Sequence, residues 1–314
     1  MEPALGVALR ALARGPQRHT MTPEAARRQL VGQATLVADD AVLMNRIEDR
    51  QIPGPDGDEL TVRIYEPPDL TVDPPAIVYF HGGGWVLGDL TSHDRLCRVI
   101  AGQTPAKLIA VEYRLAPEHP FPAAHDDAVA AFRWVVEHAD ALRIDRSRIA
   151  VMGDSAGGNL AACVASATRG ETIRPAVQAL LYPVTDGRRE SPSYETFAEG
   201  FGLSRRTMEW FYDHYLPSPE QATDPRVSPG LADDLAGLPP AIVVTAGFDV
   251  LRDEGDAFAE RLRAAGVAVA HQHFPSLIHG YANMTALAPC RRALDQTISE
   301  LAYQLYVVLP GARS

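Results

Sequence analysis

From residue 59 onward, short runs of β-branched and other apolar residues alternate with stretches of helical spacing. Most of the apolar runs are too apolar for half-exposed strands, so we expect them inside a sheet that is covered on both faces. Stretches of helical spacing separate them, among them Ala123–His138 and Asp253–Ala265. This alternation predicts an α/β fold with a mostly parallel central sheet flanked by helices. The expected strands are Leu60–Tyr65, Ala76–Phe80, Lys107–Glu112, Arg148–Met152, Val177–Tyr182, Ala241–Thr245 and Val267–Phe274.

Two segments do not follow the alternation. Residues 1–48 have helical spacing, and Thr22 and Pro23 mark a helix start. Residues 187–230 are rich in proline, serine and aromatic residues and contain a possible helix at Ser204–Tyr215. Ligands bind at the edge of a parallel sheet where its strands end, so insertions there can cover the site. We therefore expect both segments to form a helical cap on one catalytic domain made of residues 49–186 and 231–314.

Composition and charge narrow the class of protein. Hydrophobic residues make up 46% of the 314 residues and charged residues 22%, as in ordinary globular proteins. The net charge of −11 argues against a nucleic acid partner. The three cysteines are widely spaced, so we expect neither a disulfide framework nor a metal site. Residues 1–16 lack the uninterrupted apolar core of a signal peptide, and no apolar run is long enough to cross a membrane, which predicts a cytoplasmic protein.

The segment Gly153–Gly158 carries the strongest chemical signal. Its sequence, Gly-Asp-Ser-Ala-Gly-Gly, contains the G-x-S-x-G pattern between an expected strand and an expected helix. In that setting the pattern is a nucleophile elbow, whose glycines permit the sharp turn that exposes the serine hydroxyl. The start of the following helix favours developing negative charge. We expect Ser155 to be a nucleophile, the alternative being a small-residue turn with a solvent-facing serine.

A serine hydroxyl needs a base, and the base needs an acid to hold its tautomer. In α/β folds that carry a nucleophile elbow, the chain order is serine, then the acid, then histidine, and the last two lie on turns after late strands. Asp249 and His279 occupy such positions, and we expect them to complete a triad with Ser155. Asp253 is a competing acid but is more typical of a helix start. Two other histidines compete with His279 as the base, His271 and His273. They lie two residues apart within a strand pattern, which favours a structural role for both.

Acyl transfer also needs hydrogen-bond donors for the oxyanion. The sequence His-Gly-Gly-Gly-Trp at 81–85 directly follows an expected strand, and three glycines let the backbone come close to a substrate. A phosphate-binding loop is the alternative, but neither of its glycine patterns is present. We expect the N–H groups of Gly83, Gly84 and Ala156 to form an oxyanion hole, and His81 to brace the loop.

Together these motifs resemble the hormone-sensitive lipase-like esterases, the bacterial family IV carboxylesterases of the α/β-hydrolase superfamily. The resemblance rests on residues 81–85, 113–123, 153–158, 249–255 and 279–280, which span most of the chain in the family's order. It implies a hydrolase of short- to medium-chain acyl esters that uses no metal or other cofactor, has a helical cap and often forms a homodimer. Val250 departs from the proline common in the family. The proline-rich run 113–123 is interpreted as a rigid loop that braces the domain.

Two rival functions remain open on these residues. The triad and oxyanion hole serve an amide or formamide carbonyl as well as an ester. A catalytically silent binding protein on the same scaffold is the other rival, as in plant hormone receptors that resemble these esterases and have lost the triad histidine. His279 is present here, which favours the enzyme.

Overall fold

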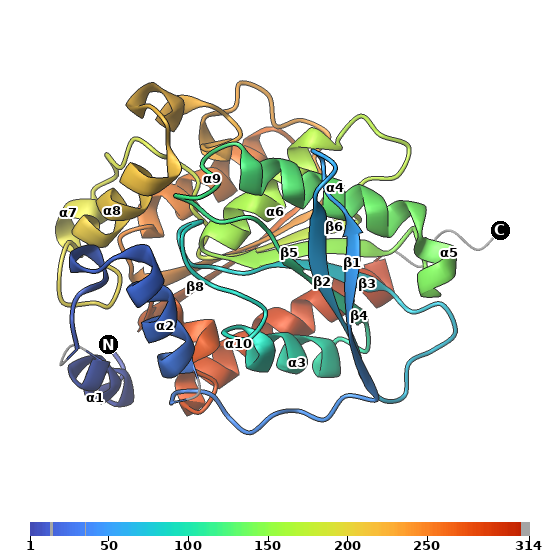
Figure 1. Cartoon of the computed structure of the whole chain (residues 1–314), viewed down its shortest axis with the longest axis horizontal. Helices are drawn as coiled ribbons and strands as arrows, with labels where there is room; N and C mark the ends of the chain where they lie inside the picture. The colour runs from blue at the N-terminus through green and yellow to red at the C-terminus, as the bar shows by residue number, and fades with distance from the viewer. Residues whose placement is uncertain (13–14, 35, 309–314) are drawn as a thin grey trace.

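The computed structural model of the protein describes residues 1–12, 15–34 and 36–308 (Figure 1). Residues 13–14 and 35 of the expected cap and residues 309–314 of the expected catalytic domain lie outside the described residues. The described residues form one eight-stranded sheet in the order β1-β2-β4-β3-β5-β6-β7-β8. Strand β2 is antiparallel to both of its neighbours, and all other pairs are parallel. The strands are β1 (Arg46–Pro53), β2 (Glu59–Glu66), β3 (Ala76–Phe80), β4 (Lys107–Glu112), β5 (Ile149–Asp154), β6 (Val177–Leu181), β7 (Ala241–Phe248) and β8 (Val269–Ile278).

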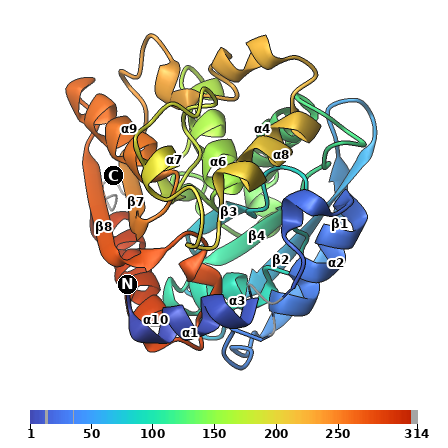
Figure 2. The same ribbon diagram turned by 90° about the vertical axis from the view of Figure 1, so that its left-hand side faces the viewer.

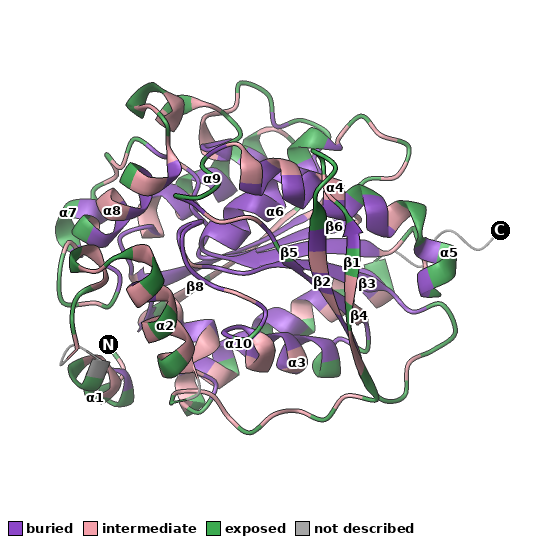
Figure 3. Cartoon of the chain, in the orientation of Figure 1, coloured by how far each residue is buried: buried purple, intermediate pink, exposed green. Residues whose placement is uncertain are grey.

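The central strands are apolar because both of their faces are covered. Every residue of β3, β5 and β6 is buried (Figure 3). Val78 of β3 is in register with Ile109 of β4 and Val151 of β5. Helices α4 (Ala123–Glu137), α6 (Ala156–Ala167) and α9 (Arg252–Ala264) cover one face of the sheet (Figure 1). Helices α3 (Asp94–Gln103) and α10 (Ala288–Tyr303) cover the other. Two apolar cores therefore lie on opposite faces of the sheet, as expected for a parallel α/β fold.

Parts of the N-terminal segment and of residues 187–230 lie side by side, where α8 is next to the start of α2, on the side of the molecule that faces the viewer in Figure 2. The short helix η1 packs against α8, whose first turn is capped by Ser204: its Oγ accepts the N–H of Thr207 at 3.1 Å. Two chain segments that are far apart in sequence thus meet beyond one edge of the sheet. The helices of the two segments are α1 (Pro3–Leu12), η1 (Arg18–Thr20), α2 (Pro23–Ala34), α7 (Ser193–Thr196), α8 (Arg205–Tyr215), η2 (Pro219–Thr223) and η3 (Pro229–Leu231).

The shorter helical pieces complete the fold. They are α5 (Ala139–Leu142), η4 (Tyr281–Asn283) and the π-helix η5 (Gln304–Val308). No helix in the described ranges has both the length and the apolar character that crossing a membrane requires.

The expected α/β fold and its seven expected strands are confirmed, each strand to within a few residues. The sequence pattern did not predict strand β1, and the first three residues of this strand, 46–48, fall in the segment expected to be helical. Its sequence, Arg-Ile-Glu-Asp-Arg-Gln-Ile-Pro, holds only two large aliphatic residues, because it is an edge strand with mostly exposed or half-buried positions. An edge strand of this kind lacks the continuous apolar run that marks the central strands.

Candidate active site

Ser155 lies in the sharp turn between β5 and α6. Its backbone angles, φ 58° and ψ −119°, are strained for a residue with a side chain. The Ser155 N–H holds the turn by donating to the Leu181 carbonyl of the next strand at 2.9 Å. Gly157 has to be glycine, since a Cβ there would overlap the Phe80 carbonyl of β3. The local sequence therefore produces the elbow expected from the G-x-S-x-G pattern.

The loops after β7 and β8 bring two more of the expected residues to this serine. The Nε2 atom of His279 lies 2.9 Å from the Oγ of Ser155, and its Nδ1 lies 2.7 Å from the Oδ2 of Asp249. The Asp249 side chain is fully buried, and its Oδ1 accepts the N–H of Leu251 at 2.9 Å. With Nδ1–H donated to the carboxylate, Nε2 is left to accept the serine hydroxyl, which is the arrangement that a base needs.

The competing acid and bases lie elsewhere. Asp253 is in the first turn of α9, where its Oδ1 accepts the Nε–H of Arg252 at 2.7 Å. On β8, His271 and His273 share contacts with Thr245, and His271 Nε2 lies 3.0 Å from Asp256 Oδ1. Among the described residues none of these side chains contacts Ser155, so they belong to separate structural clusters.

Three backbone N–H groups near the elbow have no hydrogen-bond partner among the described residues: those of Gly83, Gly84 and Ala156. Ala156 is the first residue of α6, where N–H groups are free and the helix dipole favours negative charge. Gly84 has a φ of 61°, and a Cβ there would overlap the Phe211 ring of α8. A side chain at this position would therefore displace the loop, and the expected donors are those that the fold leaves free.

A buried carboxylate joins the elbow to the glycine loop, which is the segment of residues 81–88 that directly follows β3. The sequence pattern did not single this carboxylate out. Asp154, next to the serine, accepts the Tyr79 hydroxyl at 2.6 Å and the Gly82 N–H at 2.8 Å, both on Oδ1. Asn283 Nδ2 donates to Oδ2 at 3.3 Å, and His93 Nε2 lies 3.6 Å from Oδ1. Burial acts to raise the pKa of Asp154, but His93, Tyr79 and Gly82 outweigh it and lower the pKa to about 2. The only sequence signal for this role is its place inside the elbow motif.

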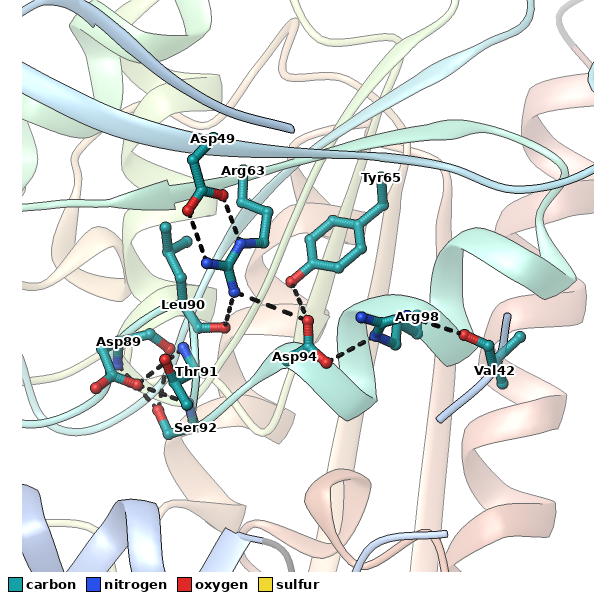
Figure 4. Close-up of polar contacts among 10 residues, drawn as sticks. All are labelled: Val42, Asp49, Arg63, Tyr65, Asp89, Leu90, Thr91, Ser92, Asp94 and Arg98. Atoms are coloured by element: carbon teal, nitrogen blue, oxygen red, sulfur yellow. Dashed lines mark hydrogen bonds and ion pairs between the residues drawn. The ribbon is translucent and has the colours of Figure 1, made fainter. Parts of the chain in front are cut away.

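The segment that carries His93 is itself anchored by the network drawn in Figure 4. Arg63 of β2 donates to both oxygens of Asp49 and, at 3.3 Å, to the carbonyl of Leu90. Asp94, at the start of α3, accepts the Tyr65 hydroxyl at 3.0 Å and the Arg98 Nε–H at 2.7 Å. These contacts fix the start of α3 against β2, and thereby the position of His93 beside Asp154.

His81 and the run 113–123 support the glycine loop from the other side. His81 is buried and its ring stacks on Tyr113, whose hydroxyl donates to the His81 carbonyl at 2.7 Å. Burial and the nearby His93 lower the pKa of His81 to about 4, so the ring is neutral at pH 7. Further along the run, the Ala116 N–H donates to the carbonyl of Trp85 at 2.9 Å. These contacts match the bracing roles expected for His81 and for the run 113–123.

Ser155 opens into a cavity of about 530 Å³, within the range of ordinary small-molecule sites. The glycine loop and His279 form one side, and residues from the N-terminal helices and from the 187–230 segment form the other. Leu30 and Leu203 are among the apolar lining residues, and Arg18 and Gln33 are among the polar ones. In the described ranges no cluster of three or more metal-ligating side chains is present.

Comparisons with known proteins identify the family of this chain. Residues 77–283 match the alpha/beta hydrolase fold family. The chain is 46% identical over 248 residues to the carboxylic ester hydrolase LipN of Mycobacterium tuberculosis, a match that covers 77% of this chain and 65% of LipN. It is 41% identical over 273 residues to an ethyl acetate hydrolase of Pseudomonas putida, covering 86% of each chain.

Solved structures agree as well. An ester hydrolase from the metagenome of Lake Arreo, in complex with a bipyridine phosphonate derivative, superposes with a TM-score of 0.91 at 40% identity and covers 96% of this chain and 98% of its own. A thermostable esterase of Pseudomonas putida superposes with a TM-score of 0.92 at 36% identity, covering 97% of each chain. The resemblance to the hormone-sensitive lipase-like carboxylesterases is thereby confirmed, and this chain belongs to the alpha/beta hydrolase fold family, among its carboxylic ester hydrolases.

Proposed function

We propose that this carboxylesterase hydrolyses short- to medium-chain acyl esters through an acyl-enzyme on Ser155, with His279 as the base and Asp249 as the residue that orients it. One observation carries the proposal: the continuous hydrogen-bonded chain from Asp249 through His279 to Ser155, at 2.7 and 2.9 Å. This is the contact pattern that activates a serine hydroxyl.

In the acylation step, His279 removes the proton of Ser155 as its oxygen attacks the ester carbonyl. The N–H groups of Gly83, Gly84 and Ala156 stabilise the oxyanion, and each such donor is worth roughly 10²–10³ in rate. His279 then protonates the leaving alcohol. Asp249 stays ionised and stabilises the imidazolium, a role that its hydrogen bond from Leu251 supports.

In the deacylation step, the same imidazole activates a water molecule, which attacks the acyl-enzyme from the side that the alcohol has left. The tetrahedral intermediate uses the same three N–H donors. Collapse of the intermediate returns the proton to Ser155 and releases the acid, so no further group is needed to complete the cycle.

Residues 1–48 and 187–230 act in this proposal as a cap that limits the length of the acyl chain. Side chains from both segments line the cavity beside Ser155. A cavity of about 530 Å³ bounded in this way fits a short or medium acyl chain better than a long one. The homodimer and the cytoplasmic location expected from the sequence stay predictions.

The test is hydrolysis of p-nitrophenyl esters of increasing acyl length by the wild type and by Ser155→Ala. Ser299→Ala, on the exposed face of α10, serves as the matched control. We expect activity to peak at short or medium chains and to fall by several orders of magnitude in Ser155→Ala only, as for other triad serines. An inert wild type, or a Ser155→Ala variant that keeps its activity in the folded state, would contradict the proposal. Anilides of the same acids, assayed in parallel, test the amide alternative.

A further inference from the structure

The cavity beside Ser155 contains a cation that the ester chemistry does not use. Arg18, in η1, lines this cavity, and its Nε atom is buried without a hydrogen-bond partner. Its one hydrogen bond among the described side chains is a long contact of 3.4 Å from Nη2 to the Oε1 of Gln33. The Arg18 guanidinium forms no ion pair with a described carboxylate, and burial lowers the pKa of Arg18 from its ordinary value with no described charged neighbour acting on it. The Arg18 side chain as a whole is half-buried, and a cation held partly out of water without an anion costs folding free energy and needs a reason to be kept.

The surroundings of Arg18 do not supply that anion. Two described carboxylates line the cavity, and neither bonds to Arg18: Asp154 is bonded to Tyr79 and Gly82, and Glu199 is exposed. Glu209 of α8, the helix against which η1 packs, is bonded to Arg205 at 3.1 Å. The net charge of −11 makes the protein's overall field repel anions. The guanidinium of Arg18 is thus an unpaired positive charge among the described residues of a protein of net negative charge, and it lies beside the cavity that contains Ser155.

Neighbouring groups make the position suitable for an anion. His19, the next residue of η1, lines the same cavity, and its Nδ1 atom is likewise buried without a hydrogen-bond partner in the described part of the chain. Gln33 of α2 contacts the guanidinium only through the long 3.4 Å hydrogen bond. A guanidinium offers a planar fork of donors that matches a carboxylate.

From this geometry we propose that Arg18 binds a carboxylate on the substrate, so that the preferred substrates are esters that carry a second, free carboxylate away from the scissile bond. The inference rests on the proposed ester hydrolysis at Ser155 and adds the class of ester. The carboxylate belongs either to the acyl part, as in the monoester of a dicarboxylic acid, or to the alcohol part, as in the acetate of a hydroxy acid. Both present the same anion to Arg18.

The experiment compares each anionic ester with an uncharged counterpart of the same shape, in which an isopropyl group replaces the carboxylate. Monoethyl glutarate tests the acyl source and the acetate of γ-hydroxybutyrate tests the alcohol source. The measured quantity is the ratio of kcat/KM for the anionic ester to that for its counterpart. A ratio is independent of how much of a variant is folded. The enzymes are the wild type, Arg18→Gln, Arg18→Lys and, as a matched control, Arg28→Gln, whose arginine is exposed on α2.

We expect Arg18→Gln to lower the ratio roughly 10- to 100-fold in one of the two pairs, as loss of a charged hydrogen-bond partner does. Arg18→Lys should restore part of it, and Arg28→Gln should leave it at the wild-type value. Equal ratios for the wild type and Arg18→Gln in both pairs would overturn the proposal.

Failure of the underlying ester hydrolysis gives a different result, since the wild type would then hydrolyse neither uncharged counterpart. In that case calorimetric binding of monoethyl glutarate and of γ-hydroxybutyrate acetate to Ser155→Ala, with and without Arg18→Gln, still tests the anion site. Binding of one of them that is lost with Arg18→Gln supports the site, and binding of neither, or binding that does not depend on Arg18, overturns it.

Discussion

Replacing Asp154 by asparagine removes a buried negative charge without changing the size of the side chain. The remaining side-chain oxygen can still accept the Tyr79 hydroxyl and the Gly82 N–H, now as neutral hydrogen bonds. At the position of Oδ2 the new amide N–H₂ faces the Nδ2 of Asn283, which is also a donor. The attraction to His93 is lost as well. The variant therefore weakens all four polar contacts of the Asp154 side chain, including the one that ties Gly82 to the elbow.

The magnitude follows from these contacts. A hydrogen bond to a charged group contributes about 1 kcal/mol more than a neutral one, so two of them and the clash with Asn283 cost about 2–3 kcal/mol. The pKa of about 2 gives a similar figure, since lowering the pKa of a carboxyl group from 3.8 to about 2 corresponds to roughly 2 kcal/mol. With an unfolding entropy of roughly 2.1 cal/mol/K per residue over 314 residues, each kcal/mol lowers Tm by about 1.5 °C. We expect Tm to fall by roughly 3–5 °C.

Catalysis should fall further than stability suggests. Gly82 precedes the two glycines whose N–H groups are proposed as oxyanion donors, so a loosened Gly82 misplaces both. Partial loss of such donors should lower kcat roughly 10- to 100-fold with little change in KM. The assays are steady-state hydrolysis of p-nitrophenyl butyrate and thermal unfolding, with Asp140→Asn, an exposed carboxylate, as the control.

The pH dependence gives a second check. The folded pKa of Asp154 is depressed, so its stabilisation is complete above pH 4 and is lost as the pH falls toward 2. The stability difference between wild type and Asp154→Asn should be constant from pH 5 to 8 and shrink below pH 4. A variant with wild-type kcat and a lowered Tm would refute the link to the oxyanion loop, and an unchanged Tm would refute the energetic reasoning.

Three further predictions concern single positions. Asp249→Asn should lower kcat about 10³- to 10⁴-fold because His279 loses the carboxylate that holds its tautomer, measured with p-nitrophenyl butyrate; a loss below tenfold would contradict the assignment. Gly84→Ala should lower kcat by roughly 10² because its Cβ overlaps the Phe211 ring and displaces the donor, whereas Gly170→Ala, in open space, should not change it. Burial raises the pKa of Glu254 well above its usual value, so the stabilisation linked to its protonation is full below about pH 4.3 and is lost as the pH rises. The Glu254→Gln variant should therefore gain stability relative to the wild type between pH 4 and 7, measured by urea denaturation. A stability difference that does not change with pH would contradict this.

The central strands and the elbow could be predicted because local sequence determines them. A strand such as Ala76–Phe80, buried on both faces, has to be apolar throughout, and the turn at Ser155 requires glycine nearby. Asp249 and His279 could be placed because chain order in this fold restricts where an acid and a base can lie. In each case a physical requirement restricts the residue types within a short stretch of sequence, and such a stretch can be recognised.

Other features of the fold and the site do not restrict the residue types of a short stretch, so they could not be predicted from the sequence. The edge strand Arg46–Pro53 is mostly polar, so its pairing with β2 depends on the partner strand more than on its own pattern. The role of Asp154 depends on Tyr79, His93 and Asn283, which come from three distant parts of the chain. The exposure of Arg18 to the cavity likewise depends on how η1 packs against α8. Tertiary packing decides such features, and a single sequence does not display it.

The hydrogen bonds of Arg27 have a consequence for altering the substrate range of this enzyme. From α2 its guanidinium reaches the carbonyls of Val86 and Ala116 and the carboxylate of Glu118, which ties the wall of the cavity to the glycine loop and to the run 113–123. If the cavity wall selects the acyl chain as proposed, selection of substrate and speed of turnover are coupled through α2. Mutational libraries aimed at a broader range should leave Arg27 fixed and vary side chains such as Leu203, which lines the cavity from the other segment.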